Sequence, residues 1–373
     1  METRRFPSLG EEVSLLGYGC MRFPTLPGGE IDEPQAEALL DRALALGVNY
    51  FDTAWPYHDG KSEAFVGRVL KKHPRDRFFL ATKLPSWELK SPADPERIFT
   101  EQLRRCQVDY FDFYLAHNLD EEHYALFEAA EGYDFLARMK AEGKIRHLGF
   151  SFHDTPRHLE RVLNDHTWDF VQIQLNYLDW ELQDAKTQYE LITARGLPVV
   201  VMEPVRGGAL ATLTPEALAL LQAEAPGRSA ASWALRYAAS LPGVMTVLSG
   251  MSSLEQVEDN AAAMTPFQPL TDRERDCLDR AARLYRAKGA IPCTGCRYCM
   301  DCPAGVDIPR VFAAYNAYLV DPRKSHFLNT YGYLGEEHQA GRCVRCGACL
   351  PKCPQGLKIP DLLAKVDAFA REG

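Results

Sequence analysis

Short apolar runs alternate with amphipathic stretches along the first 265 residues of the chain. The runs lie at 50–53, 78–82, 111–116, 145–151, 170–174, 199–202 and 245–249, after an N-terminal strand pair near Arg5 and at 14–19. Runs of this length and composition are typical of buried strands in a parallel sheet. Between them, apolar positions recur at helical spacing at 35–46, 63–72, 95–106, 126–142, 157–163, 185–195 and 254–262. The pattern therefore predicts repeated strand–helix units.

Eight such units in succession predict a closed parallel (β/α)8 barrel. An open doubly wound sheet is the alternative, but no Gly-x-Gly-x-x-Gly segment follows the first strand, which weakens it. Further helices are predicted at 271–287, 306–318 and 359–369. We expect a barrel over 1–268, a connecting helix over 269–290 and a mostly helical C-terminal domain over 291–373.

Composition and charge narrow the class of protein. The 373 residues are 46% hydrophobic and 25% charged, as in a globular protein, and the formal net charge is −9. No block of Lys or Arg is present, which argues against a nucleic acid or an anionic membrane as partner. No apolar segment follows the two N-terminal arginines as in a signal peptide, and none has the length of a membrane span. We therefore expect a cytoplasmic protein.

Eight of the eleven cysteines fall after position 290, in two runs. The first run is Cys293-x2-Cys296-x2-Cys299-x2-Cys302, followed by Pro303, and the second is Cys343-x2-Cys346-x2-Cys349-x3-Cys353, followed by Pro354. In a chain without a secretory signal such runs indicate metal or redox chemistry rather than disulfides. Two structural zinc sites, or one iron–sulfur cluster beside a degenerate run, are the alternatives to two clusters.

The second run resembles the cysteine run of bacterial ferredoxins, including its terminal proline. The first run is one residue shorter between its third and fourth cysteines. The resemblance implies two 4Fe-4S clusters, with the fourth cysteine of each run bound to the other cluster. It thus assigns Cys293, Cys296, Cys299 and Cys353 to one cluster, and Cys302, Cys343, Cys346 and Cys349 to the other.

Polar residues stand where the predicted barrel strands end, which is where barrel enzymes place their catalytic groups. Asp52 ends the second strand and Tyr57 lies in the loop after it. Lys83 ends the third strand and His117 the fourth. Because these loops are neighbours in a barrel, we expect the four side chains to converge.

Here the chain resembles the aldo-keto reductases, whose active site is an Asp-Tyr-Lys-His tetrad at these strand ends. The resemblance covers roughly residues 5–265, including Phe-Asp-Thr-Ala at 51–54 and Gly-Lys-Ser-Glu at 60–63. It implies that Tyr57 is the general acid and that the cation of Lys83 favours its phenolate. Asp52 would balance that cation, and a neutral His117 would hold the carbonyl oxygen of the substrate.

The resemblance also implies a nicotinamide nucleotide across the top of the barrel, since no side chain donates a hydride. Ser151 and Gln172 match positions that hold the carboxamide. Met202 stands where many family members have an aromatic residue against the nicotinamide ring. Gly207 and its neighbour Gly208 suit a close approach of the backbone to the pyrophosphate.

The last barrel loop matches the adenosine-binding segment of the family at Gly250, Gln256 and Asn260. It lacks the basic residue that would bind a 2′-phosphate, and Glu258 and Asp259 stand nearby. NADP(H) and NAD(H) are therefore both expected as cofactors.

The leading hypothesis is a nicotinamide-dependent oxidoreductase that reduces an aldehyde or ketone. Trp55, Trp87 and Trp180 follow strand ends and are candidates for an apolar substrate pocket. A second hypothesis is a ferredoxin-linked electron-transfer enzyme with a redox protein as partner; it requires an intermediary such as a flavin, because a cluster moves one electron and a hydride carries two. A third is a redox-sensing module in which the barrel binds the cofactor and the C-terminal domain docks a partner.

Overall fold

The structure is a computed structural model that describes residues 1–320 and 322–372. Its contacts divide the chain into two compact units, which are described separately below. The barrel unit comprises Met1–Pro204 and Leu235–Pro269, and the cluster unit comprises Val205–Ala234 and Leu270–Gly373. The division expected from the sequence follows chain order, whereas here residues 205–234 group with the C-terminal part of the chain.

Eight parallel strands close into a barrel in the order β10-β3-β4-β5-β6-β7-β8-β9. They are β3 (Leu16–Gly19), β4 (Tyr50–Asp52), β5 (Phe79–Pro85), β6 (Phe111–His117), β7 (Ile145–Phe152), β8 (Phe170–Gln174), β9 (Val199–Met202) and β10 (Val244–Ser249). An antiparallel pair, β1 (Thr3–Arg5) and β2 (Glu12–Ser14), precedes them. Buried Tyr50, Phe113, Phe170 and Met245 belong to the core inside the barrel. The predicted closed barrel is confirmed.

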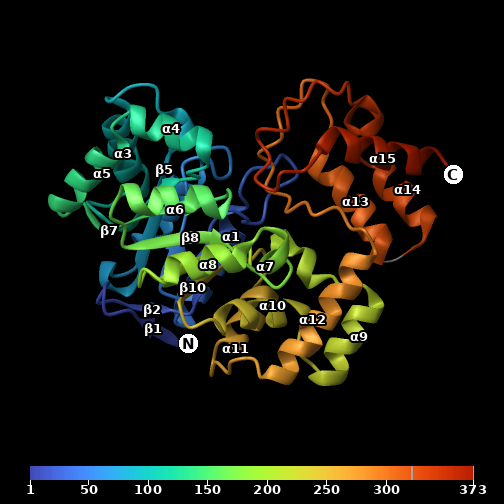
Figure 1. The fold of residues 1–373 in the computed structure, drawn as a ribbon, viewed down its shortest axis with the longest axis horizontal. Coiled ribbons are helices and arrows are strands. Elements are labelled where there is room, and N and C mark those ends of the chain that lie inside the picture. The colour runs from blue at the N-terminus through green and yellow to red at the C-terminus, as the bar shows by residue number, and fades with distance from the viewer. Residues whose placement is uncertain (321, 373) are drawn as a thin grey trace. The chain divides into compact units, whose positions relative to one another are not determined.

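Helices surround these strands (Figure 1). They are α1 (Glu33–Ala45), α2 (Ser62–Leu70), α3 (Asp94–Cys106), α4 (Glu121–Ala129), α5 (Gly132–Ala141), α6 (Pro156–Asp165), α7 (Asp179–Leu182), α8 (Ala185–Thr193) and α11 (Leu254–Ala263), while α10 (Ala230–Ala239) begins in the cluster unit. The prediction of one helix over 126–142 is wrong. The chain leaves the helical conformation at Glu131, which has a φ of 53°, and α5 begins at Gly132, where a Cβ would lie 2.4 Å from the Phe127 ring.

The cluster unit is helical apart from its loops and single turns. Its helices are α9 (Pro215–Glu224), α12 (Asp272–Ala287), α13 (Ile308–Val320), α14 (Lys324–Gly332) and α15 (Ile359–Arg371). The predicted helix at 271–287 is α12; Thr271 caps it, and Glu274 bonds back to the cap in a capping box. This helix packs against α9, whereas α13, α14 and α15 gather at the C-terminal end (Figure 1).

A separate core lies beneath the two cysteine runs. Val311 and Phe312 of α13, Phe327 of α14, and Leu363 and Val366 of α15 are all buried there. Cys299 belongs to this core, and Cys293, Cys302, Cys343, Cys349 and Cys353 pack against it, so both runs rest on a core that is distinct from that of the barrel. Among the described residues, no helix has both the length and the apolar character that a membrane span requires.

Candidate functional site

The four predicted tetrad residues meet at the carboxyl ends of their strands. The Lys83 Nζ atom lies 2.6 Å from Asp52 Oδ1 and 3.3 Å from Tyr57 Oη, and it donates to the Thr53 carbonyl at 2.8 Å. The ring centroids of Tyr57 and His117 are 6.3 Å apart. Both members of the ion pair are almost fully buried, with side-chain exposures of 1% for Lys83 and 3% for Asp52. The structure thus brings together the residues that the sequence predicted.

The barrel register explains this convergence. Lys83 pairs with Leu115 between β5 and β6, and Asp52 pairs with Ala81 between β4 and β5. The carboxyl ends of neighbouring parallel strands therefore lie at one rim of the barrel, and the loops that follow these strands lie on the same side.

Burial sets the protonation state of His117. Its pKa is held well below the usual value near 6.5, first by burial and then by the positive charge of Lys83 and by His153 and His123. Its Nδ1 atom is buried with no hydrogen-bond partner among the described residues. His117 is therefore a neutral imidazole at neutral pH.

The pKa of Tyr57 moves in the direction opposite to the one expected from Lys83. Burial raises it well above the usual value near 10, and the negative charges of Asp52 and Glu203 raise it further, against a lowering by Arg22. The expectation that a nearby cation favours the phenolate neglected desolvation, which is the larger effect here. The Tyr57 hydroxyl is thus held protonated in the free protein.

A polar network behind the tetrad was missed by the sequence analysis. Glu63 is buried and accepts hydrogen bonds from Thr82 Oγ1 at 2.7 Å and Gln102 Nε2 at 2.6 Å. Gln102 also donates to the Lys83 carbonyl at 2.9 Å, and Arg105 lies 3.3 Å from the second Glu63 oxygen. The available signal was a polar residue, Gln102, on the buried face of α3 beside Ile98 and Phe99.

One of the three candidate tryptophans contacts the tetrad. The Trp87 ring lies 4.9 Å from the His117 ring and 5.7 Å from that of His123. Trp55 instead carries the Arg105 guanidinium on its face at 3.8 Å. Trp180 packs beside Tyr189 and Tyr237. Among the three, the geometry therefore favours Trp87 as a wall of a substrate pocket.

The residues predicted to hold the carboxamide end β7 and β8. Ser151 is buried and its Oγ accepts from the Asn118 backbone amide at 2.8 Å. Gln172 Nε2 lies 3.6 Å from Met202 Sδ, while Gln172 Oε1 is buried without a hydrogen-bond partner among the described residues. An unpartnered buried acceptor is costly unless a ligand satisfies it, so this position fits an amide-bearing cofactor.

The predicted adenosine loop follows β10. Asn260 Nδ2 donates to Ser249 Oγ at 3.0 Å, and Gln256 Oε1 accepts from the Ser252 amide at 2.7 Å. A Cβ on Gly250 would lie 3.0 Å from the Arg22 side chain, so the backbone approaches closely there. These bonds fix the loop within the barrel unit.

Two ion pairs near this loop come from distant parts of the sequence. Arg42 of α1 pairs with Glu258 at 2.5 Å, and Arg22, in the loop after β3, pairs with Glu203, in the loop after β9, at 2.7 Å. The sequence analysis found the acidic side of the first pair and missed its cation, because Arg42 is 216 residues away in the chain.

The predicted pyrophosphate glycine lies in the cluster unit. Gly207 has a φ of +64°, and a Cβ there would lie 1.8 Å from the Thr294 carbonyl oxygen, inside the first cysteine run. The neighbouring Arg206 is buried and donates from Nη2 to Gln355 Oε1 at 3.2 Å, two residues beyond Cys353. The segment after β9 is thus packed against both chain segments that carry the first cysteine set.

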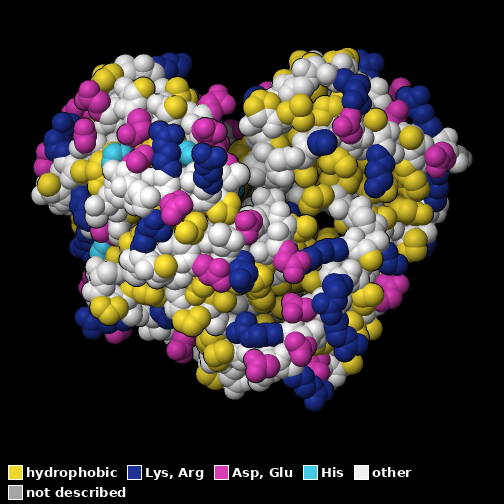
Figure 2. Space-filling view, in the orientation of Figure 1, with side chains coloured by type: hydrophobic (Ala, Val, Ile, Leu, Met, Phe, Trp, Pro, Cys, Tyr) yellow, Lys and Arg dark blue, Asp and Glu magenta, His cyan; other side chains and the backbone are white. Residues whose placement is uncertain are grey.

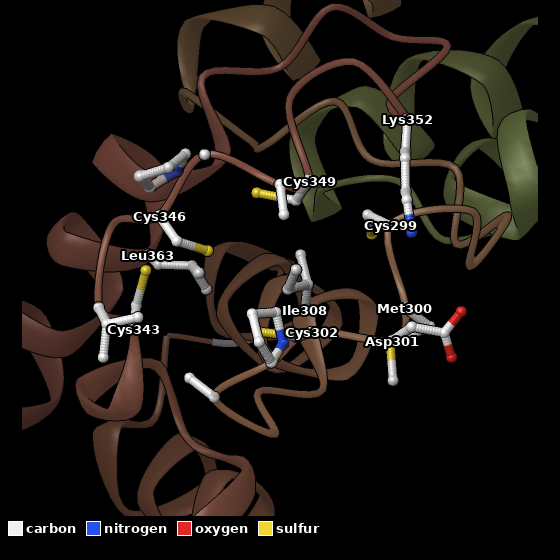
Figure 3. Close-up of a pocket in the computed structure, with 16 residues that line it drawn as sticks. Cys299, Met300, Asp301, Cys302, Ile308, Cys343, Cys346, Cys349, Lys352 and Leu363 are labelled. Carbon is white, nitrogen blue, oxygen red and sulfur yellow. The ribbon is translucent and has the colours of Figure 1, made fainter.

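The eight cysteines line two cavities. Cys293, Cys296, Cys299 and Cys353 surround one, and Cys302, Cys343, Cys346 and Cys349 surround the other, which Cys299 also borders. In Figure 3 the sulfur atoms of Cys343, Cys346 and Cys349 turn toward a common space that Cys302 approaches from the other run. This grouping is the one that the ferredoxin resemblance implies.

The thiols within each set also influence one another electrostatically. Burial raises the pKa of Cys299 to about 12, with further raising by Cys296, Cys293 and Cys353. Burial also raises the pKa of Cys349, with Cys343, Cys302 and Cys346 as the neighbouring thiols. Cys299 and Cys349 therefore each lie near the other three thiols of their own set.

The cysteine geometry suits a multi-atom cluster better than a zinc ion. Among the described residues, no group of three or more His, Cys, Asp or Glu side chains lies close enough to hold a single metal ion. A zinc site requires four thiolates about 2.3 Å from one atom. Thiols placed around a cavity instead fit a cubane, whose iron atoms are separate.

The shorter first run differs from the second only beyond its third cysteine. Two and four residues after the first cysteine, both runs have left-handed residues, Gly295 and Arg297 in one and Arg345 and Gly347 in the other. The first run then turns through Asp301, with a φ of 64°. The missing residue therefore lies beyond the part of the run in which the two backbones share these left-handed positions.

The sequence matches two families. Residues 15–283 match the aldo/keto reductase family, and residues 292–358 match the 4Fe-4S dicluster domain. The two matches correspond to the tetrad-bearing barrel and to the two cysteine runs.

Similar proteins include enzymes and solved structures. The chain is 29% identical to L-galactose dehydrogenase of Arabidopsis thaliana, over 72% of this chain and 90% of that protein. It is 27% identical to the NADH-specific methylglyoxal reductase of Escherichia coli, over 68% and 90%. Among structures, the holo form of aldo-keto reductase AKR11C1 from Bacillus halodurans is 32% identical with a TM-score of 0.61, over 75% and 96%. An NADPH complex of an aldo-keto reductase from Klebsiella pneumoniae is 26% identical with a TM-score of 0.60, over 76% and 95%.

Proposed function

Because the chain belongs to the aldo/keto reductase family and carries a 4Fe-4S dicluster domain, we propose that it reduces an aldehyde or ketone with a nicotinamide nucleotide. The observation that carries this proposal is the position of Lys83 Nζ between Asp52 Oδ1 and Tyr57 Oη. A lysine with a purely structural role has no need of both a buried carboxylate and a buried phenol. Proton transfer to a carbonyl oxygen uses both, the phenol as the acid and the ion pair to stabilise the phenolate.

The proposed chemistry assigns one task to each tetrad residue. A bound nicotinamide nucleotide supplies the hydride, since no side chain does. His117, neutral through burial, donates a hydrogen bond to the carbonyl oxygen and fixes its position. Tyr57 gives its proton to that oxygen as negative charge develops there. Lys83 then stabilises the phenolate, and Asp52 compensates the lysine so that its charge is tolerated when buried.

The low acidity of Tyr57 in the free protein is consistent with this role. A hydroxyl that burial keeps protonated does not lose its proton to solvent before substrate binds. The proton moves only when the oxyanion forms next to it, because a carbonyl oxygen that receives a hydride becomes much more basic than the phenolate. Proton transfer is therefore coupled to the reduction itself.

We propose that Ser151, Gln172 and Met202 hold the nicotinamide end of the cofactor, and that Gly250, Gln256 and Asn260 hold the adenosine. The unpartnered Gln172 Oε1 atom supports an amide ligand at this position. In this proposal a 2′-phosphate would lie near Glu258, which is paired with Arg42. Because a carboxylate repels that phosphate, we propose that NADH is accepted as well as NADPH.

The eight cysteines are the proposed ligands of two 4Fe-4S clusters, one for each cavity. The first set holds the segment after β9 through the contacts of Thr294 and Gln355, so we assign it a structural role for that segment. A cluster bound by the second set supplies one-electron chemistry near the surface of the cluster unit.

An anaerobic panel of aldehydes and ketones with NADH and NADPH tests the proposal. Nucleotide oxidation at its near-ultraviolet band and the cluster absorption would be recorded together. We expect stoichiometric oxidation of nucleotide with formation of alcohol, by protein that contains iron and sulfide. Formation of alcohol only when dithionite replaces the nucleotide would contradict the proposed reaction and favour the ferredoxin-linked alternative.

A further inference from the structure

The loop that carries the second cysteine run has a charge unlike the rest of the chain. Between Glu337 and Asp361 the sequence has no Asp or Glu, and it has four Lys or Arg residues, in a chain with a net charge of −9. The four cations are Arg342, Arg345, Lys352 and Lys358, and all four are exposed. We call this stretch, residues 338–360, the basic loop.

Acidic neighbours neutralise only part of the basic loop. Arg345 pairs with Asp361 at 2.5 Å, with both side chains about 60% exposed, and such a pair is weak in water. Among the described residues, the other three cations have no acidic side chain within ion-pair distance. The loop therefore presents a net positive potential.

Apolar side chains and a cysteine are exposed between these charges. Val344 is 69% exposed and Leu350 is 44% exposed, and Cys346 is exposed as well. The first run, 293–302, differs, because its exposed residues are Arg297 and Asp301 and neither is apolar. In Figure 2, Lys and Arg side chains lie beside hydrophobic ones over the part of the cluster unit that includes α15.

We propose that the basic loop is a docking surface for a small acidic protein that carries single electrons. Exposed apolar residues among cations form the mixture typical of transient interfaces, in which charge steers the encounter and a small apolar contact holds it. Redox encounters of this kind use small interfaces, which a single loop can supply. The proposal rests on the proposed cluster at the second cysteine set.

An acidic protein fits this surface better than an anionic membrane does. Recognition of acidic lipids usually takes a continuous group of four to eight cations. Here the four cations are spread over 17 residues of chain, and Glu336, Glu337 and Asp361 flank them. Because these acidic residues flank the cations, a protein with a complementary pattern of charges fits the loop better than a membrane surface of uniform negative charge.

The test is binding of the anaerobic holoprotein to an immobilised plant-type ferredoxin, an acidic one-electron carrier. The variant is Arg342→Glu, Lys352→Glu and Lys358→Glu combined. The matched control reverses three exposed cations of the barrel unit, Lys71→Glu, Arg157→Glu and Lys186→Glu, with the same change in net charge. We expect binding that weakens as salt rises, a loss of roughly tenfold or more in the variant, and little change in the control.

Iron content and nucleotide-dependent carbonyl reduction are measured on every protein, so that a failure of the proposed enzyme is distinguished from a failure of the docking surface. Absence of ferredoxin binding by iron-loaded, active wild type would overturn the proposal. Equal weakening in the control would overturn it too, since net charge alone would then explain binding. Binding to phosphatidylserine vesicles that the triple variant abolishes would assign the loop to membranes instead.

Discussion

The tetrad and the two cysteine sets differ in what holds them together. Lys83, Asp52 and Tyr57 are connected by hydrogen bonds of 2.6 and 3.3 Å that the protein alone supplies. The cysteines instead surround cavities, and burial raises the pKa of Cys299 and Cys349. The barrel site is thus organised before any ligand binds, whereas the thiols of each cysteine set are joined to one another only through a bound cluster. One chain thus contains a site held by its own hydrogen bonds and sites held by a bound cluster, and the two kinds of site can be perturbed separately.

The largest expected effect is that of iron removal on the cluster unit. Because a metal site that is absent from the unfolded chain couples metal binding to folding, loss of iron should unfold this unit. Hydrogen exchange of the chelated protein should show lost protection in α13 and α15 and retained protection in β5 and β6. Equal loss of protection in the barrel strands would contradict the independence of the two regions.

Substitution of Tyr57 by Phe should affect catalysis alone. We expect carbonyl reduction to fall by about 10²–10⁴, as for loss of a general acid, with iron content and nucleotide affinity retained. The control is Tyr124→Phe, a buried tyrosine whose hydroxyl bonds Asp165 at 2.9 Å. Turnover in Tyr57→Phe within a few-fold of the wild type would reject the assigned role.

Substitution of Gly207 by Ala tests the contact between the segment after β9 and the first run. The new Cβ would lie 1.8 Å from the Thr294 carbonyl oxygen, at a φ of +64°. A loss of about 1–3 kcal/mol in the free energy of unfolding is expected, with weaker retention of iron by the first set. Gly208→Ala is the matched control, because it has φ +94° and no atom within 4 Å of its Cβ. The same loss in both variants would show that backbone strain, and not the contact, is responsible.

The smallest effect concerns pH and His117. Burial lowers the pKa of His117 in the folded protein well below 6.5, so below that pH the unfolded chain binds a proton that the folded chain does not. Stability should therefore fall as pH drops below about 6.5, by up to about 1.4 kcal/mol per pH unit from this group. The denaturation midpoints of wild type and His117→Gln, compared between pH 7 and pH 5, measure this difference. Parallel pH profiles would contradict the assigned neutral state.

The barrel, the tetrad residues and the two cysteine runs could be predicted from the sequence. Strand runs and cysteine runs are local patterns, so periodicity and motif spacing were sufficient for them, whereas the tetrad was assigned from the strand ends together with the resemblance to the aldo-keto reductases. The break at Glu131 was missed because the helical pattern continues through it, and the sequence does not show the positive φ of Glu131 or the close packing of Gly132 on the Phe127 ring.

Contacts between distant parts of the chain could not be predicted. The pairing of Arg42 with Glu258 joins residues 216 positions apart, and the Arg206–Gln355 bond joins residues 149 apart. The raised pKa of Tyr57 was not predicted for a related reason, since the sequence shows the neighbouring cation but not the degree of burial. The long-range contacts and the pKa of Tyr57 both depend on the tertiary structure.

The most direct test of the central claim is the fate of a labelled hydride. The anaerobic holoprotein would be given a nicotinamide nucleotide carrying deuterium at the transferred position together with a carbonyl substrate, and the alcohol would be analysed by mass spectrometry. The account predicts one deuterium on the former carbonyl carbon, with or without added ferredoxin. Alcohol that contains no deuterium, formed only when an external one-electron donor is present, would contradict it.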